Sequence, residues 1–190
     1  RKSTSTDITV KCRIGVDEQS PEQILPEFLK HVSGSGVSRI IIHARKAILK
    51  GLSPKENRDV PPLDYDIVFK MKEKFPNLHI SLNGGVTRLT TAKELLAKGI
   101  DGVMIGRSAY QQPTQTLSEV DRQIFNEDAG KSPFDIATTM RSYIKEHCEK
   151  GGKPHQVTRH MTGLFHGLPG AKTWRQYLSG GSCKESIKFY

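Results

Sequence analysis

Short apolar runs alternate with amphipathic stretches through the first 110 residues or so of the chain. The runs lie at 8–14, 39–43, 78–82 and 102–105, and each predicts a strand. Between them, apolar residues at helical spacing predict helices over 21–32, 65–75 and 89–98. Pro26 falls inside the first helix, which we therefore expect to begin later or to bend. Regular alternation of strand and helix predicts an α/β fold with a parallel sheet.

The pattern changes after Pro113. From about Leu117 to Gln176 the sequence predicts helices, with loops at 130–133 and 151–154, and it predicts no further strand. We therefore expect a small all-helical domain after the α/β part. Four strand units cannot close an eight-stranded barrel, so on pattern alone a doubly wound sheet stays open as an alternative to part of a barrel.

The positive charge is concentrated toward the C-terminus. The net charge is +9; residues 1–130 hold 19 Lys+Arg against 16 Asp+Glu (+3), and residues 131–190 hold 10 against 4 (+6). A basic C-terminal segment suits a polyanion such as nucleic acid, although a lysine-rich soluble surface has the same composition.

The cysteines, Cys12, Cys148 and Cys183, show neither disulfide nor zinc spacing, so we expect no metal. No apolar run approaches a membrane span, and we expect an intracellular protein, cytoplasmic or organellar. A first strand within seven residues of Arg1 suggests a fragment. The oligomeric state stays open.

Two glycine-bearing turns follow the last two predicted strands. They are Asn83-Gly84-Gly85 and Gly106-Arg107. In a parallel barrel such turns expose backbone N–H groups that bind phosphate, with Arg107 as a counter-charge. The alternative is a pair of ordinary turns that need glycine for positive φ.

Cationic and hydrogen-bonding side chains lie near the carboxyl ends of all four predicted strands. Because these ends meet at one edge of a parallel sheet, they suit an anionic ligand. The residues are Lys11, Arg13, His43, Arg45, Asn83 and Arg107. Lys11 could instead face solvent at a sheet edge, and His43 could be structural.

Two basic segments suit an RNA backbone. The excursion 44–62, too long for a routine connection, carries five Lys/Arg residues. Near the C-terminus, Lys172 and Arg175 are predicted on one helical side, with Trp174 and Tyr177 on a neighbouring one. A solvated loop is the alternative for the excursion, and Trp174 is expected in a helical core.

The chain resembles the tRNA-dihydrouridine synthases of the DusA type. The similarity covers nearly all of residues 8–178. The motifs that carry it are Val10-Lys11-Cys12-Arg13-Ile14-Gly15, Ile41-Ile42-His43-Ala44-Arg45-Lys46, Gly51-Leu52-Ser53-Pro54-Lys55-Glu56-Asn57-Arg58, Pro61-Pro62-Leu63-Asp64-Tyr65, Asn83-Gly84-Gly85, Asp101-Gly102-Val103-Met104-Ile105-Gly106-Arg107, Thr158-Arg159-His160-Met161, Gly163-Leu164-Phe165 and Pro169-Gly170-Ala171. The excursion and the C-terminal motifs are specific to this branch.

The resemblance implies an FMN-dependent (β/α)8 TIM barrel followed by a helical tRNA-binding domain. In such enzymes NADPH reduces FMN, which reduces a D-loop uridine of tRNA to 5,6-dihydrouridine. Residues 1–115 would be the second half of the barrel, 116–180 the helical domain and 181–190 a tail. The implied FMN-binding residues are Lys11, His43, Asn83, Gly84, Gly85, Gly106 and Arg107. The implied tRNA-binding residues are Arg45, Lys55, Arg58, Lys172 and Arg175.

The chain departs from the family at the proton donor. The family's cysteine lies in an Asn-x-x-Cys-Pro stretch, which does not occur in this sequence. Cys12 follows Lys11 in the same strand and should point to the other face. We therefore assign no catalytic residue here, expect the cysteine upstream of this chain, and expect the chain alone to be inactive. The alternatives are a flavin barrel that acts on a small molecule and a non-catalytic RNA-binding remnant.

Overall fold

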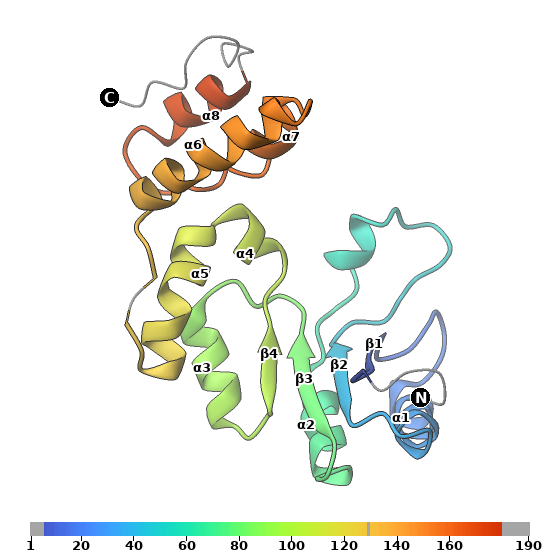
Figure 1. Cartoon of the computed structure of the whole chain (residues 1–190). Coiled ribbons are helices and arrows are strands. Elements are labelled where there is room, and N and C mark those ends of the chain that lie inside the picture. Colours follow the sequence, from blue (N-terminus) through green and yellow to red (C-terminus); the bar gives the residue numbers. More distant parts are fainter. Residues whose placement is uncertain (1–5, 129, 180–190) are drawn as a thin grey trace. The chain divides into compact units, whose positions relative to one another are not determined.

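The computed structural model describes residues 6–128 and 130–179, which form two compact units (Figure 1). The first unit holds the described residues up to Val86 together with Thr90–Ile105. The second holds Thr87–Leu89 and the described residues from Gly106 onward. Each unit is described separately below.

The first unit is built on a parallel sheet of four strands in chain order. The strands are β1 (Thr9–Arg13), β2 (Arg39–His43), β3 (His79–Asn83) and β4 (Gly102–Met104). All three neighbouring pairs are parallel. The structure thus confirms the α/β class and the parallel sheet that the alternating pattern predicts.

Three helices connect these strands. They are α1 (Pro21–Gly34), α2 (Tyr65–Lys74) and α3 (Leu89–Ala97). The side chain of Asp64 caps α2 by accepting the N–H of Ile67 at 3.1 Å. The expectation of a later start for the first helix is wrong: α1 begins at Pro21 and continues through Pro26.

The tolerance of Pro26 has a local reason. Proline at the first helical position is favoured, since its missing N–H has no partner there in any case. Pro26 lies in the second turn, and the carbonyl group it leaves without a helical donor is that of Glu22, an exposed residue. Burial of Leu25, Pro26 and Leu29 then offsets the lost hydrogen bond.

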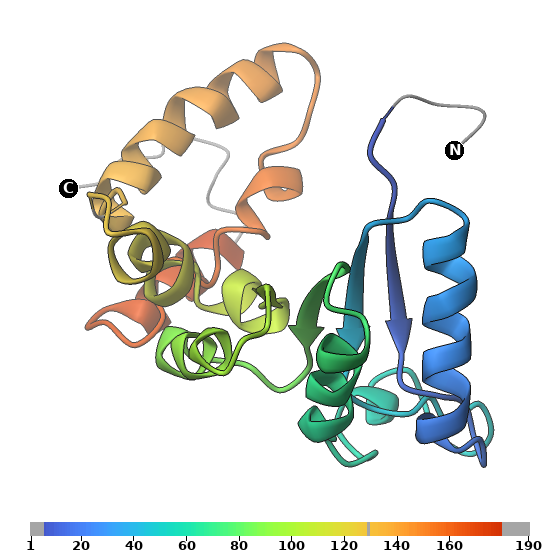
Figure 2. The ribbon, with the colours of Figure 1, turned by 90° about the horizontal axis from the view of Figure 1, so that it is seen from below.

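Alternate strand residues form the core of the first unit. Ile40, Ile42, Ile80 and Leu82 are fully buried. They belong to one cluster with residues of all three helices, among them Leu25 and Leu29 of α1, Ile67 and Val68 of α2, and Leu95 of α3. Figure 2 shows α1 and α2 beside one another along the strands. Because strand side chains alternate in direction, the intervening residues occupy the opposite face of the sheet.

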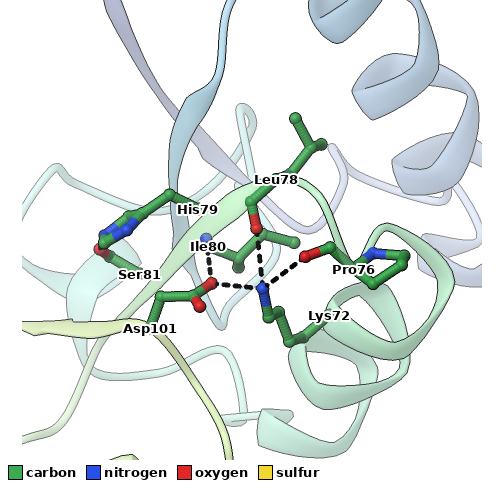
Figure 3. A network of polar contacts seen from close by, with 7 residues as sticks. All are labelled: Lys72, Pro76, Leu78, His79, Ile80, Ser81 and Asp101. Carbon is green, nitrogen blue, oxygen red and sulfur yellow. Dashed lines mark hydrogen bonds and ion pairs between the residues drawn. The ribbon is translucent and has the colours of Figure 1, made fainter.

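A network of hydrogen bonds and one ion pair lies at the amino-terminal ends of β3 and β4 (Figure 3). Lys72 Nζ of α2 lies 2.8 Å from Asp101 Oδ2 and donates to the carbonyl oxygens of Pro76 and Leu78, both at 3.0 Å. Asp101 Oδ2 also accepts the backbone N–H of Ile80 at 2.8 Å. The network therefore ties α2, the start of β3 and the residue before β4 together.

The described elements of the second unit are helical. They are α4 (Arg107–Gln111), α5 (Pro113–Val120), a π-helical turn η2 (Asp121–Phe125), α6 (Pro133–Glu149), α7 (Pro154–Thr158) and α8 (Ala171–Ser179). A buried cluster around Ile144, Leu164 and Phe165 joins the later helices. None of the helices in the described ranges has the length and apolar character needed to cross a membrane.

The main boundary between the two compact units falls after Ile105, and α4 and α5 group with the described residues that follow them. The domain limits predicted at residues 115 and 180 stay predictions. The predicted tail, 181–190, and Cys183 lie outside the described residues. Assignment of the units to functional domains stays a prediction.

Candidate functional site

The register of the sheet places four side chains in one row at its carboxyl end. Arg13 pairs with His43, His43 with Asn83, and Asn83 with Met104. All four belong to the set of alternate positions opposite the helices. The structure therefore brings Arg13, His43 and Asn83, which the sequence places at the carboxyl ends of three strands, onto one face of one sheet.

Lys11 lies two residues before Arg13 and thus on the same face. It pairs in register with Ile41, and its side chain is exposed. Burial and then the neighbouring Arg13 lower the pKa of the Lys11 ammonium. Lys11 lies on the edge strand β1, its charge stands near a second cation, and its role in binding a ligand stays a prediction.

Cys12 faces the other way, as the alternation predicts. It packs against the core on the helix side. There it lines a cavity of about 240 Å³, together with Ile24, Leu25 and Phe28 of α1. Burial raises the pKa of the Cys12 thiol to about 11, although Lys11 opposes this shift. The thiol therefore lies on the face of the sheet opposite the side chains of the row.

The Asn83-Gly84-Gly85 turn is closely approached by three side chains. Gly84 has φ +114°, and a Cβ atom there would lie 2.8 Å from His43 Cδ2. Gly85 has φ +68°, and a Cβ atom there would lie 2.5 Å from Leu63 Cδ1. Tyr65 donates its hydroxyl to the carbonyl oxygen of Gly84 at 2.6 Å. Both glycines are required by backbone conformation and by packing.

Asn83 fixes the ends of two strands relative to each other. Its Nδ2 donates to the carbonyl oxygen of Met104 at 2.8 Å, across the β3–β4 pair. Gly106 and Arg107, the other half of the predicted phosphate site, begin α4 in the second unit. Their participation in one site with Gly84 and Gly85 stays a prediction.

The excursion after β2 is held by two arginines. Arg13 Nη1 donates to the carbonyl oxygens of Lys46 and Asn57, both at 2.8 Å. Arg45 Nη1 donates to the carbonyl oxygens of Asp59, at 3.2 Å, and Pro61. Both guanidinium groups are half-buried. Each arginine thus binds backbone of the excursion, and a tRNA contact by Arg45 stays a prediction.

Asn57 forms side-chain hydrogen bonds to two earlier residues of the excursion. Its Oδ1 accepts the N–H of Ile48 at 2.7 Å, and its Nδ2 donates to the carbonyl oxygens of Ile48 at 2.6 Å and Leu52 at 3.4 Å. Asn57 is half-buried, whereas Lys55 and Arg58 are exposed on either side of it. All three residues lie at the short helical turn η1 (Glu56–Arg58).

The guanidinium groups of Arg45 and Arg58 lie close enough to Arg13 to affect its pKa. Burial, then Arg45 and then Arg58, lower the pKa of Arg13. Burial raises the pKa of Tyr65, and the nearby Arg45 opposes that shift. The carboxyl end of the sheet therefore carries three neighbouring guanidinium groups, which suit a phosphate-bearing or anionic ligand.

In the second unit, α8 has a basic face and a packed face. Lys172, Arg175 and Gln176 are exposed. Trp174 packs on Phe165 with ring centroids 4.8 Å apart, and its Nε1 donates to the carbonyl oxygen of Met161 at 2.8 Å. The expectation that Trp174 belongs to the helical core is confirmed, as is the separation of the basic side from Trp174.

Sequence reasoning assigned no role to Tyr65 or Asn57. Both lie in motifs that carry the family resemblance, but neither is charged, and their partners are backbone atoms distant in sequence. Only the run of prolines and polar residues around them signals an ordered excursion. Among the described residues, no group of three or more His, Cys, Asp or Glu side chains could hold a metal ion.

The family model and the curated relatives agree on one family. The family model described as "Dihydrouridine synthase (Dus)" matches residues 1–188. The tRNA-dihydrouridine(20/20a) synthase of Shewanella oneidensis is 49% identical over 178 residues, which cover 93% of this chain and 52% of that protein. Those of Salmonella typhi and Escherichia coli K12 are each 48% identical over 186 residues, covering 97% of this chain and 55% and 53% of those proteins.

The chain spans about half the length of the curated relatives it matches. Among solved structures, a chain of the Salmonella typhimurium response regulator RcsB aligns with a TM-score of 0.33 at 12% identity, over 90% of this chain and 99% of that one. This value is too low to bear on the fold. The match of the family model over nearly every residue shows that the chain belongs to the dihydrouridine synthase (Dus) family.

Proposed function

We propose that this chain is the C-terminal part of an FMN-dependent enzyme that reduces uridine in the D-loop of tRNA to 5,6-dihydrouridine, with NADPH as reductant. Its first unit would be the second half of a TIM barrel, and its second unit a helical tRNA-binding domain. The observation that carries the proposal is the row of Arg13, His43 and Asn83 in a chain of this family. Lys11 lies on the same face, two residues before Arg13 on β1.

The residues of the row fit a flavin mononucleotide. The cofactor is anionic and rich in hydrogen-bonding atoms, and the row offers a cation, an imidazole and an amide on one face of the sheet. Lys11, His43 and Asn83 would hold FMN near its ring. Gly84, Gly85, Gly106 and Arg107 would hold its ribityl and phosphate parts. When bound, FMN supplies hydride chemistry.

The chain's own residues would contribute charge and position. The Lys11 ammonium would stabilise negative charge that develops in the site, and its proximity to Arg13 strengthens that field. Lys55, Arg58, Lys172 and Arg175 would bind tRNA phosphates on the two sides of an extruded uridine. The proton would come from a cysteine outside residues 1–190, because the sequence lacks the Asn-x-x-Cys-Pro stretch and Cys12 faces the helices.

The test uses the FMN-loaded holoenzyme that contains this chain, unmodified tRNA and NADPH. Nucleoside mass spectrometry should detect a gain of two hydrogens on uridine; a wild-type protein that produces none contradicts the proposed function. Lys11→Ala should lower turnover by on the order of tenfold to a hundredfold while the FMN-free protein still binds tRNA. Lys30→Ala, an exposed lysine of α1, is the matched control. Unchanged turnover in Lys11→Ala would refute the role of Lys11 alone.

A further inference from the structure

The turn that presents Lys55 and Arg58 is attached to the rest of the excursion mainly through Asn57. The amide of Asn57 pairs with both the N–H and the carbonyl group of Ile48, at 2.7 and 2.6 Å, as a neighbouring strand would. Ile48 lies near the start of the excursion and Asn57 near its end. One side chain therefore closes the loop between them.

The backbone of Asn57 is fixed as well. Its N–H donates to the carbonyl oxygen of Ser53 at 2.9 Å, and its own carbonyl oxygen accepts Arg13 Nη1 at 2.8 Å. Arg13 belongs to β1, so Asn57 connects the turn to the sheet. Ser53 and Glu56 add reciprocal hydrogen bonds at the start of the turn, at 2.8 and 3.3 Å.

We propose that Asn57 is a positioning residue for the tRNA substrate, which holds Lys55 and Arg58 in the orientation in which they meet the phosphate backbone. This inference rests on the proposed function. The two cations are exposed on long flexible side chains, so a rigid backbone beneath them lowers the ordering cost of binding. Asn57 itself is half-buried, with its amide occupied by Ile48 and Leu52, and acts through its neighbours.

The test measures KM for tRNA and kcat in the FMN-loaded holoenzyme that contains this chain. Asn57→Ala should raise KM by on the order of tenfold and leave kcat within about twofold, because the side-chain bonds that hold the turn are lost while the backbone carbonyl group that accepts Arg13 is kept. Asn57→Asp keeps the acceptor for the Ile48 N–H but sets a carboxylate against two carbonyl oxygens, and should raise KM similarly. Asn77→Ala, an exposed asparagine before β3, is the matched control.

A double-mutant cycle separates positioning from general stability. In a Lys55→Ala/Arg58→Ala background, Asn57→Ala should raise KM no further, since the groups that it positions are gone. An equal increase in both backgrounds, an unchanged KM, or a loss of kcat and FMN content alongside KM would overturn the inference. A wild-type protein without dihydrouridine activity would instead overturn the proposed function.

Discussion

Lys72 and Asp101 form an ion pair with 2.8 Å between Nζ and Oδ2. The pair lies near the amino-terminal ends of β3 and β4, whereas the candidate site lies at the carboxyl ends of the strands. Their side chains are only 20% and 28% exposed. The lysine also binds two carbonyl oxygens, and the aspartate also binds the N–H of Ile80. The pair therefore joins α2 to β3 and to the residue that precedes β4, and its expected role is stability.

Asp101→Asn should lower the free energy of unfolding by about 1–2 kcal/mol, because Lys72 loses its counter-charge in a partly desolvated position. Burial alone would raise the pKa of Asp101, but the hydrogen bonds from Lys72 and Ile80 outweigh it and lower the pKa from its ordinary 3.8. A lowered pKa stabilises the fold above pH 3.8, and this contribution is lost as the pH falls through the folded-state value. Chemical denaturation at several pH values measures both effects.

Lys70→Met is the matched control for that network. Lys70 pairs with Glu22 at 3.2 Å, but the two side chains are 60% and 70% exposed. Its loss should change the free energy of unfolding by less than about 0.5 kcal/mol. A loss for Asp101→Asn that is no larger than this would show that the network is ordinary surface charge.

Gly84→Ala should destabilise the fold by at least about 2 kcal/mol, since it adds both a positive-φ penalty and a clash with His43. The displaced imidazole should also reduce the FMN content of the purified holoenzyme. Thermal melts and flavin absorbance measure the two effects.

Gly99→Ala isolates the conformational part of that cost. Gly99 has φ +96°, and no atom lies within 4 Å of a Cβ atom there. The expected loss is about 1 kcal/mol with full FMN content. Equal losses at the two glycines would mean that the close approach of His43 to Gly84 contributes nothing.

The thiol of Cys12 should alkylate slowly. With its pKa raised to about 11 from 9.0, the thiolate fraction near pH 8 is roughly a hundredfold smaller than in an unfolded peptide. Iodoacetamide kinetics on a Cys148→Ser/Cys183→Ser protein measure this, with the peptide 8–16 as reference. Equal rates for protein and peptide would contradict the burial of Cys12 against α1.

The sheet was predictable because its signal is local. Ile40, Ile42, Ile80 and Leu82 stand at alternate positions in short β-rich runs, and each run is followed by a helix with one apolar face. The row of Arg13, His43 and Asn83 follows from parallel strands in register, so the sequence also predicts its members.

The contacts of these side chains were not predictable to the same degree. Arg13 and Arg45 are identical in type to a ligand-binding arginine, but here each binds backbone carbonyl groups of residues up to 44 positions away. Asn57 is a single polar residue among many, and its importance depends on a loop closure that no local pattern encodes. Pro26 shows the converse: its local rule is overridden by burial in the core.

The basic face of α8 provides the last prediction. Lys172→Glu/Arg175→Glu should weaken tRNA binding by tenfold or more and reduce the salt dependence of the dissociation constant, with a slope lower by about 1 for each lost phosphate contact. The fold should be unaffected, because both side chains are exposed while Trp174 and Leu178 of the same helix pack against the buried cluster. Filter binding of unmodified tRNA over a range of salt concentrations measures affinity and slope together.

Arg141→Glu/Lys145→Glu on α6 is the control with the same change of charge. These two side chains are also exposed in the second unit. Lys145 forms a loose, exposed i,i+4 ion pair with Glu149, with 3.9 Å between Nζ and Oε1. If binding depends on total charge alone, the two double variants lose affinity equally, and the specific role of α8 is refuted. If α8 contacts phosphates, the α6 variant loses only the long-range part of the attraction, which disappears as salt approaches physiological strength, while the α8 variant stays weaker at every salt concentration.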